Sequence, residues 1–595
     1  MYCYESRNFY CDGYIPDGVV VNDEIDYKLN FNNVDDRKNN IEINFKELAK
    51  ATIYKDNLAQ DLIRIAVYVY IADCMTKRGS KEAVSTDPYD EYWNVNLNFY
   101  IPVLELNFWN REEVKGLLSK ALGFVVGHKY KFNFCSWIED NKQLLLDLPT
   151  KKLDIDCISM FSGGLDSLYS SLLLLEEDRK PLLLSHQSNN KLVKKRTELK
   201  DEVAKVYNDG LIKWELPLKK KNGNSIEFTQ RSRSFVYACL GIGFAKCLDL
   251  EDVYLSDNGI VSFNLRSTDQ NIGTLNTRST NPKLIYYVNE LSKLMWQDKA
   301  PKVENKLIHL TKADVVKGIK KLNQDKLLPL THSCVSTLGL TNVQPFCGVC
   351  SQCVDRRFAT EYAEISKANE PLNSYKVDIF RESLTSQIDR KIGKTHAENY
   401  YRKAKIIQNA SELEFMEYFN ELWGFIPDNE DESDFLSNAM ILHKRFSEQV
   451  IKVLGNFGAE YLSGKFPENS LVDMVYKNSN VPVNINDYKP IKEKRLIVDL
   501  KHKNCIFDKK DFKLTNKEIF FINKLAENKG TVIKYKELVS KATNHLELAK
   551  KRKQTIENKF EKFCKVNEII PFELFESQRG YGYKLNLDKD EILAL

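Results

Sequence analysis

The chain has 595 residues, of which 43% are hydrophobic and 29% charged, with 87 Lys and Arg against 83 Asp and Glu. This length and composition predict several packed domains and exclude both a single small module and a disordered protein. No apolar run approaches the roughly 18 residues that cross a bilayer, and the first residues lack the pattern of a secretory signal. The 13 cysteines are too unevenly spaced for a disulfide framework. We therefore expect a cytoplasmic protein without membrane contacts.

Residues 1–150 mix a helical pattern over about 58–77 with strand-like alternation at 93–101 and 130–134. We interpret them as an N-terminal α+β domain without a catalytic constellation. From residue 151 strands alternate with helices: the pattern predicts strands at 153–161, 182–185, 211–216 and 253–256, and helices at 167–176, 197–207 and 232–245. This order predicts an α/β domain over 151–368, with a doubly wound parallel sheet that binds ligands at the C-terminal strand ends. Residues 369–500 carry long helical patterns and form a mostly helical region.

A glycine turn joins the first of these strands to its helix, with the sequence Ser162-Gly163-Gly164-Leu165-Asp166-Ser167. Consecutive glycines allow backbone angles closed to other residues, so that several N–H groups converge on one oxyanion at a helix N-terminus. We interpret the turn as a phosphate loop in which Asp166 holds Mg²⁺ and Ser162 and Ser167 donate hydroxyl hydrogen bonds. The alternative is a tight strand–helix turn, which would require neither Asp166 nor Ser162.

Four cysteines form a C-x12-C-x2-C-x2-C array: Cys334, Cys347, Cys350 and Cys353. Two overlapping C-x2-C steps bring three thiolates around one point, and the fourth closes a tetrahedral shell that suits Zn²⁺. Such a closed shell predicts a structural metal. An iron–sulfur cluster and four unrelated buried thiols are the alternatives.

Residues 162–167 resemble the SGGxDS motif of the PP-loop ATP pyrophosphatases, which have an adenine nucleotide alpha hydrolase-like fold. The resemblance implies binding of ATP and attack of a substrate oxygen on its α-phosphate, giving an adenylate and pyrophosphate. With the cysteine array, residues 154–357 resemble the QueC family of 7-cyano-7-deazaguanine synthases, which adenylate the carboxylate of 7-carboxy-7-deazaguanine before ammonia displaces AMP to give an amide and then a nitrile. Thr311–Asp314 resembles the TK-A-E helix start of that family, and Arg356 and Arg357 its basic residues after the cysteines.

Two segments depart from that family: Ser256–Ile260 replaces a YPDCR-type stretch, and Thr277–Pro282 follows later. Both are more similar to the QueC-like proteins of antiphage defence operons, such as the QatC group. This similarity leaves the acceptor and product open, with ammonia, a partner protein and a nucleic acid as candidates.

Further site residues are expected on other strand ends. Arg231 and Arg233 precede the third crossover helix and suit the α-phosphate or the substrate carboxylate, because arginine offers a rigid fork to such groups. Asn258 and Gly259 are expected to form the floor of the purine site, and Arg278 to clamp an oxyanion. Solvated loop arginines are the alternative for all three arginines.

Positive charge is concentrated at the C-terminus, where residues 501–595 have 21 Lys and Arg against 14 Asp and Glu. Thr515 and Glu518 form a capping box that opens a helix, and further helices are predicted over 535–542 and 546–566. Strands over 571–576 and 581–585, joined by Arg579-Gly580, follow. This order resembles the winged-helix effector domain of OmpR/PhoB-type regulators and implies DNA as a partner of residues 505–595, with a solvated protein-binding helix as the alternative. The third helix carries seven basic residues: Lys550, Lys551, Arg552, Lys553, Lys559, Lys562 and Lys565.

The leading hypothesis is ATP-dependent adenylation of a 7-deazaguanine-type carboxylate followed by C–N bond formation, with ATP, Mg²⁺ and Zn²⁺ bound and a role in antiphage defence. Two alternatives stay open. One is a DNA-binding regulator whose nucleotide domain senses ATP, and the other is a PP-loop enzyme that modifies tRNA or a nucleobase.

Overall fold

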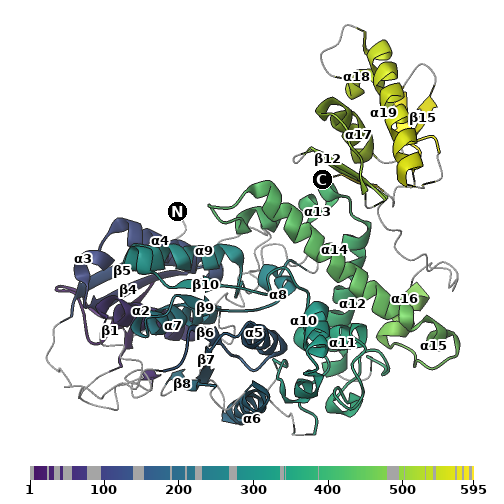
Figure 1. Ribbon diagram of the computed structural model, residues 1–595. Helices are drawn as coiled ribbons and strands as arrows, with labels where there is room; N and C mark the ends of the chain where they lie inside the picture. Colours follow the sequence, from purple (N-terminus) through teal and green to yellow (C-terminus); the bar gives the residue numbers. More distant parts are fainter. Residues whose placement is uncertain are drawn as a thin grey trace. The chain divides into compact units, whose positions relative to one another are not determined.

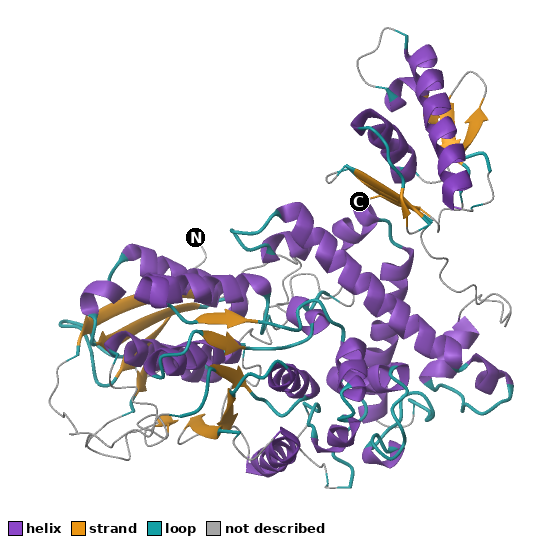
Figure 2. Cartoon of the chain, in the orientation of Figure 1, coloured by secondary structure: helices purple, strands orange, loops and turns teal. Residues whose placement is uncertain are grey.

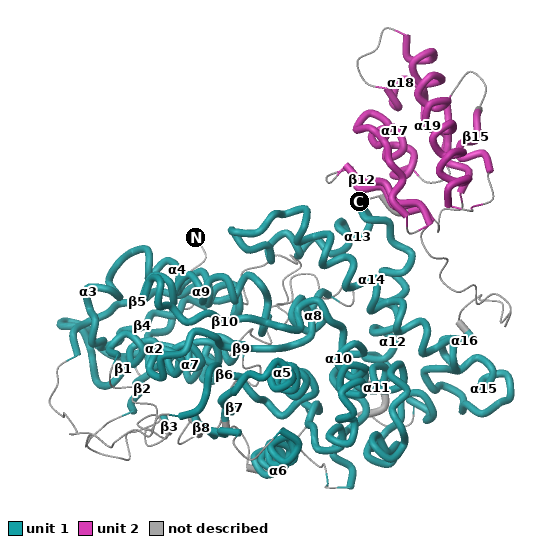
Figure 3. Tube along the Cα trace, in the orientation of Figure 1, with its two compact units in different colours: residues 1–481 teal, residues 482–595 magenta. Residues whose placement is uncertain are grey.

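The computed structural model divides the chain into two compact units, residues 1–481 and 482–595 (Figure 3). The predicted boundaries near residues 150 and 368 fall inside the first unit. Among the described residues, every helix is too short or too polar to cross a bilayer. The described residues are 6–22, 26–31, 41–43, 56–76, 95–137, 153–187, 190–207, 211–220, 231–266, 278–335, 341, 343–385, 388–478, 495–500, 503–508, 510–528, 531–539, 544–567, 569, 572–578, 582–587 and 592–594.

The first sheet contains four parallel strands in the order β2-β1-β4-β5. Its buried face carries stacked rings, with centroids 5.0 Å apart for Phe9 and Phe99 and 5.5 Å apart for Phe99 and Phe132. The expectation of an α+β domain is wrong in this respect, because β4 connects to β5 through helices in a parallel α/β arrangement. Apolar alternation identifies the buried face of a strand but not the direction of its neighbours. The elements are β1 (Ser6–Cys11), β2 (Asp26–Leu29), α2 (Asn57–Met75), β4 (Asn96–Val103), α3 (Leu106–Trp109), α4 (Glu112–Val126) and β5 (Lys129–Ser136).

The second sheet has the order β10-β9-β6-β7-β8-β3, with five parallel strands and an antiparallel edge strand, β3 (Ile41–Ile43). Apolar residues of α5 and α6 belong to the core on one face of the sheet, and those of α7 and α9 to the core on the other. The predicted parallel α/β arrangement is therefore present. The elements are β6 (Cys157–Met160), α5 (Leu165–Glu176), β7 (Pro181–Gln187), α6 (Asn190–Tyr207), β8 (Lys213–Lys220), α7 (Arg233–Cys247), β9 (Asp252–Tyr254), α9 (Pro282–Trp296) and β10 (Lys302–Glu304).

The chain reverses its direction across this sheet at β6. It proceeds from β6 to β7 and β8 on one side and then returns to add β9 and β10 on the other side (Figure 1). The C-terminal ends of β6 and β9 therefore flank a topological switch point, where open parallel sheets bind their ligands.

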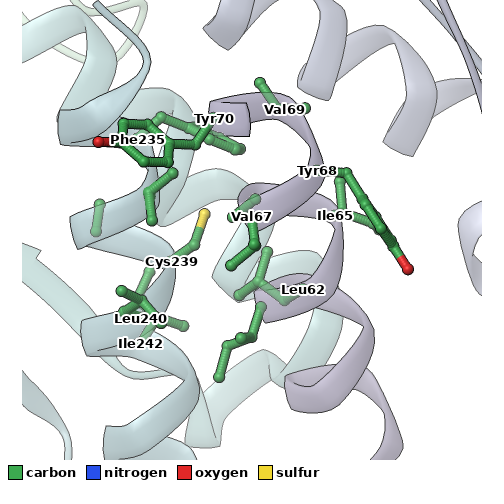
Figure 4. Packing of buried hydrophobic residues seen from close by; sticks show 14 of the residues in the cluster. Leu62, Ile65, Val67, Tyr68, Val69, Tyr70, Phe235, Cys239, Leu240 and Ile242 are labelled. Atoms are coloured by element: carbon green, nitrogen blue, oxygen red, sulfur yellow. The ribbon is translucent and has the colours of Figure 1, made fainter. Parts of the chain in front are cut away.

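Helix α7 joins the two sheets by packing against α2 (Figure 4). Two glycines let it approach both neighbours closely. A Cβ atom on Gly243 would lie 2.7 Å from Cδ1 of Ile63 in α2, and one on Gly241 would lie 2.5 Å from Cγ1 of Val253 in β9. Both sheets consequently share one hydrophobic core.

A side chain of α9 forms hydrogen bonds with the outward-facing backbone groups of the edge strand β10. Asn289 accepts a hydrogen bond from the Val303 N–H at 2.8 Å and donates one to the Val303 carbonyl at 2.9 Å. Both outward backbone groups of Val303 are thus paired.

A helical region covers the C-terminal strand ends (Figure 2). Its own hydrophobic core also contains the cysteine array. Helices α12 and α14 pack along each other, and α11 contacts both. The mostly helical pattern predicted after residue 369 is present. The helices are α8 (Gly259–Phe263), α10 (Lys312–Lys321), α11 (Ser351–Tyr362), α12 (Ile388–Asn409), α13 (Glu412–Tyr418), α14 (Glu432–Asn456), α15 (Gly458–Leu462) and α16 (Leu471–Asn478).

The second unit has its own core. Its first strand, β11 (Leu496–Asp499), pairs with β12 and β17, so this unit begins before the boundary predicted at residue 501. The predicted capping box is confirmed, since the Thr515 N–H donates to Glu518 Oε2 at 2.7 Å. The other elements are β12 (Asn504–Phe507), β13 (Lys510–Asp511), α17 (Asn516–Glu527), β14 (Ile533–Lys534), α18 (Tyr535–Leu538), α19 (His545–Asn567), β15 (Phe575–Gln578), β16 (Gly582–Leu585) and β17 (Ile592–Ala594).

Candidate functional site

The glycine turn lies between the end of β6 and the first turn of α5. Gly163 has a φ of 82°, in the left-handed region that favours glycine, and Gly164 caps the helix. The backbone N–H groups of Gly163 and Gly164 donate to the hydroxyls of Ser167 and Ser162 at 3.2 and 3.3 Å. These are long hydrogen bonds within the loop, and Ser162 is exposed while its neighbours are largely buried.

Asp166 points from this loop into a buried cluster of polar groups. Its Oδ2 accepts hydrogen bonds from Asn258 Nδ2 at 3.0 Å and from Lys312 Nζ at 2.7 Å. Its Oδ1 is buried and has no hydrogen-bond partner among the described residues. A carboxylate oxygen in such a position is a ready ligand for a cation, because buried polar atoms are almost always paired.

Residues 256–260 and 278–282 meet beside Asp166. Asp257, which follows β9, accepts hydrogen bonds at 3.0 Å from both Ser279 Oγ and Thr280 Oγ1. Desolvation raises the pKa of Asp257, and the negative charge of Asp166 raises it further. Two neighbouring carboxyl groups therefore stand at the switch point, and the positive charge of Lys312 opposes the rise in the pKa of Asp257. Thr277 lies outside the described residues.

Arg231 and Arg233 lie at the start of α7. Arg231 and Arg233 flank Ser232, whose N–H and Oγ both donate to Asp73 Oδ2, at 3.0 and 2.8 Å. The Arg233 guanidinium lies over the ring of Tyr237 at 5.5 Å, and the electrostatic interaction with Tyr237 raises the pKa of Arg233. Because α7 follows β8, both arginines lie at the same edge of the sheet as the loop.

Arg278 and Gly259 have close-packed surroundings. Arg278 donates to the Phe124 carbonyl at 2.9 Å and lies over the rings of Phe124 and Phe425. A Cβ atom on Gly259 would lie 2.0 Å from the Ile308 carbonyl oxygen, so glycine is required there for backbone packing. Asn258 reaches the loop through Asp166 and caps α8 through Ile260 and Val261.

Asp355 and Tyr400, which belong to helices α11 and α12, extend the charged cluster around Lys312 into the helical region. The carboxyl group of Asp355 accepts a hydrogen bond from the Tyr400 hydroxyl at 2.6 Å. Desolvation raises the pKa of Asp355, whereas the positive charge of Lys312 lowers it. A cavity of about 10 Å³, close to the size of one water molecule, touches Lys312, Asp355 and Tyr400.

A larger cavity of about 690 Å³ lies between α9, β10 and the start of α14. Its walls include Tyr286, Phe435 and the carboxylates of Glu290 and Glu430. None of its lining residues belongs to the glycine turn.

The four cysteines of the array come together, with their sulfur atoms all within 4.8 Å of one another. The distances from Cys347 to Cys353 and from Cys350 to Cys334 are 3.8 and 4.0 Å, close to the roughly 3.8 Å between sulfurs around a tetrahedral Zn²⁺. Gly348 between the ligands has a φ of 80°, and a Cβ atom there would lie 1.9 Å from the Val377 carbonyl oxygen. Hydrogen bonding with Cys334 lowers the pKa of Cys350 to about 7. The cluster could bind a metal ion such as zinc.

The arginines after the last cysteine are buried in ion pairs. Arg356 makes a bidentate contact with Glu370, at 2.8 and 2.7 Å, and Arg357 lies 2.8 Å from Glu361. Both are therefore bound to protein carboxylates.

Three of the seven basic residues on α19 are ion-paired: Lys553 with Glu557, Lys559 with Glu518 and Lys565 with Glu561. Lys550, Lys551, Arg552 and Lys562 form no ion pair with the described residues, and Lys550 and Lys551 are exposed. Arg579 and Gly580 lie outside the described residues. The unpaired positive charge is therefore densest in the first half of α19.

Sequence reasoning missed Asp257, Asp355 and Tyr400, and it singled out Lys312 only through a family resemblance. Asp257, Asp355 and Tyr400 lie far apart in the chain and carry no local motif. A comparison with protein-family models found no match for the sequence. A comparison with curated proteins likewise found no match.

Proposed function

We propose that residues 162–167 bind the phosphates of ATP, and that the protein adenylates a 7-deazaguanine-type carboxylate before a C–N bond is formed. The observation that carries the proposal is Asp166, whose buried Oδ1 has no hydrogen-bond partner among the described residues although it lies in a glycine turn at a helix N-terminus. The position at a switch point supports the same assignment. The specific PP-loop fold is part of this proposal.

The residues of the site fit a magnesium ion by their donor chemistry. Oxygen atoms of Asp166 and Asp257 would hold it, and the ion would neutralise charge on the phosphates. The long internal hydrogen bonds of Gly163 and Gly164 would be exchanged for hydrogen bonds to phosphate oxygens, which the dipole of α5 also favours.

In the proposed reaction, a carboxylate oxygen of the substrate attacks the α-phosphorus of ATP, and pyrophosphate leaves. A nitrogen nucleophile then attacks the acyl carbon, and AMP leaves as the C–N bond forms. Arg233 stands at the same sheet edge and would bind the substrate carboxylate or the α-phosphate. The nitrogen nucleophile is ammonia, an amine of a partner protein or a nucleic acid, and a role in antiphage defence belongs to the same proposal.

Pyrophosphate release tests this function directly. The protein is incubated with ATP, Mg²⁺ and 7-carboxy-7-deazaguanine, and we expect release that falls by about 100-fold in Asp166→Asn. Asp156→Asn is the matched control, because Asp156 lies before the same strand but is exposed and pairs with Arg179. Equal release by both variants would contradict the proposal. Release with a nucleobase or tRNA, but not with the carboxylate, would favour the nucleobase-modifying alternative.

A second candidate function rests on the unpaired basic residues of α19. We propose that the second unit is a winged-helix domain that binds DNA, with Lys550, Lys551 and Arg552 on phosphates. The order of a sheet, three helices and a closing β15-β16 hairpin supports this proposal. A regulator that senses ATP would show DNA binding that depends on ATP without pyrophosphate release.

Salt-dependent DNA retardation by the full chain tests the second candidate. Replacing Lys550, Lys551 and Arg552 with Gln should weaken binding and reduce the slope of log K against log salt by about 2.7, because each phosphate contact contributes about 0.9. The control replaces the exposed Lys510, Lys513 and Lys517 with Gln and makes the same charge change. Equal weakening by both triple variants would mean that α19 is not the contact surface.

A further inference from the structure

A short segment connects the cysteine cluster to the glycine turn. Its residue His332 donates its backbone N–H to the Gly163 carbonyl at 2.8 Å. The His332 carbonyl oxygen would lie 3.5 Å from a Cβ atom on Gly164, so the segment lies directly against both glycines. Two residues later, Cys334 contributes its sulfur to the cluster. One extended stretch therefore touches both sites.

The same segment is held at its other end by Arg356 of α11. Arg356 donates to Thr331 Oγ1 at 2.7 Å and to the Leu328 carbonyl at 2.9 Å, and Glu370 neutralises it. Its side chain is fully buried. Helix α11 begins directly after Cys350 and contains Cys353, so the cysteines also determine where Arg356 lies.

The glycine turn depends on such contacts because its own sequence restricts it little. Gly163 and Gly164 have more backbone freedom than any other residue pair, and ordering them costs correspondingly more entropy. The hydrogen bond from His332 fixes the carbonyl of Gly163, which in turn sets the direction of the following N–H groups.

We propose that a metal ion in the cysteine cluster positions the phosphate loop through residues 331–334, so that loss of the metal loosens the loop and weakens nucleotide binding. The nucleotide part rests on the proposed function, whereas the loosening of the loop does not. The physical reason is that four sulfur atoms within 4.8 Å are held together by the metal, and without it Cys334 is no longer anchored to α11.

Hydrogen exchange and nucleotide binding on the full chain test this coupling. Wild type loaded with zinc is compared with Cys347→Ser, and Cys239→Ser is the matched control because Cys239 is buried in α7, outside the cluster. In Cys347→Ser we expect amide exchange at residues 163–168 to rise at least tenfold and affinity for a non-hydrolysable ATP analogue to fall at least tenfold. Exchange in β4 and β5 should stay unchanged. In Cys239→Ser the exchange at residues 163–168, the exchange in β4 and β5 and the affinity for the ATP analogue should all equal those of wild type.

Unchanged exchange at residues 163–168 after loss of the metal would overturn the proposal. If Cys347→Ser unfolds throughout the first unit, Thr331→Val decides instead, since it keeps all four cysteines and removes the hydroxyl that accepts from Arg356 and donates to the Leu328 carbonyl. Full zinc content with faster exchange of the loop supports the coupling in that variant, and full zinc content with unchanged exchange refutes it. A loop that loosens on metal loss in a protein that never binds the ATP analogue would contradict the proposed function and leave the coupling intact.

Discussion

Lys312 Nζ lies 2.7 Å from Asp166 Oδ2, and both side chains are almost completely excluded from solvent. The ion pair joins the first turn of α10 to the glycine turn. Desolvation is the largest single influence and opposes the charged form of Lys312. The negative charges of Asp166, Asp355 and Asp257, together with the hydrogen bond to Asp166, outweigh it and raise the pKa of Lys312. A cation that binds Asp166 therefore enters a site where a lysine already supplies positive charge.

Lys312→Met should make the protein more sensitive to Mg²⁺. Breaking a buried ion pair leaves an uncompensated charge and costs about 3 to 5 kcal/mol of unfolding free energy. Because Mg²⁺ would then neutralise Asp166 and Asp257 in place of the lysine, the increase in Tm on adding Mg²⁺ should be larger than in wild type. Lys320→Met on the same helix is the control, since Lys320 donates only to two backbone carbonyls. Identical Mg²⁺ shifts in all three proteins would argue against a cation site at Asp166.

His186 should make the first unit less stable in mild acid. Its ring contacts the Leu218 carbonyl and the Tyr237 hydroxyl, and burial lowers its pKa to about 4. Between about pH 6.5 and pH 4 the unfolded chain binds a proton at this position that the folded chain does not, so stability falls as the pH falls. At pH 4.5 the loss is about 2.5 kcal/mol relative to pH 7.

His186→Gln should therefore lose about 2.5 kcal/mol less stability than wild type between pH 7 and pH 4.5 in denaturant titrations. Glutamine keeps a donor for the Leu218 carbonyl but does not titrate. The exposed His309→Gln serves as the control and should follow the wild-type profile. Parallel profiles for wild type and His186→Gln would mean that His186 is not the group responsible.

Two glycine replacements should have opposite effects. Gly259→Ala places a methyl group 2.0 Å from the Ile308 carbonyl oxygen and should destabilise the first unit by about 1 to 3 kcal/mol. Gly116→Ala lies in α4 with no atom within 4 Å of the new methyl group, and it should stabilise the protein by about 0.5 to 1 kcal/mol. Thermal or denaturant unfolding measures both. A neutral Gly259→Ala would show that the backbone at Ile308 can move away.

Metal content should separate the cysteines into two groups. We expect one zinc per chain by elemental analysis of wild type and less than half of that in Cys353→Ser, because three thiolates leave the tetrahedral shell incomplete. Cys157→Ser should retain full zinc, since Cys157 is buried in β6 outside the cluster. Iron in place of zinc would favour the iron–sulfur alternative.

Local chemistry in the sequence identified the elements that have strong signatures. The glycine turn follows a strand and opens a helix, and the spacing of Cys334 to Cys353 brought four sulfurs together, because close neighbours in sequence are constrained to be close in space. Helix α2 also follows from apolar periodicity, and α14 lies in the region where long helical patterns were predicted. Periodicity did not indicate the parallel direction of β1, β4 and β5, since it reports which face is buried and not which strand lies alongside.

The partners of Asp166 could not be predicted in the same way. Asn258 and Lys312 are 92 and 146 residues away from it in the chain, and only the packing of β9 and α10 against the loop brings them together. Arg278 illustrates the converse, since a lone arginine looks the same in sequence whether it faces a ligand or, as here, the rings of Phe124 and Phe425. Long-range contacts of this kind depend on the whole fold.

The side-chain amide of Asn289 forms the two backbone hydrogen bonds with Val303 of β10 that a neighbouring strand would otherwise form. With both outward groups of Val303 already paired, this margin of the sheet offers no template to a foreign strand, and β-mediated aggregation along it is blocked. Asn289→Leu would uncover that template while keeping the helix. Self-association under conditions where the parent chain remains monodisperse would then reveal how much a single carboxamide protects the molecule.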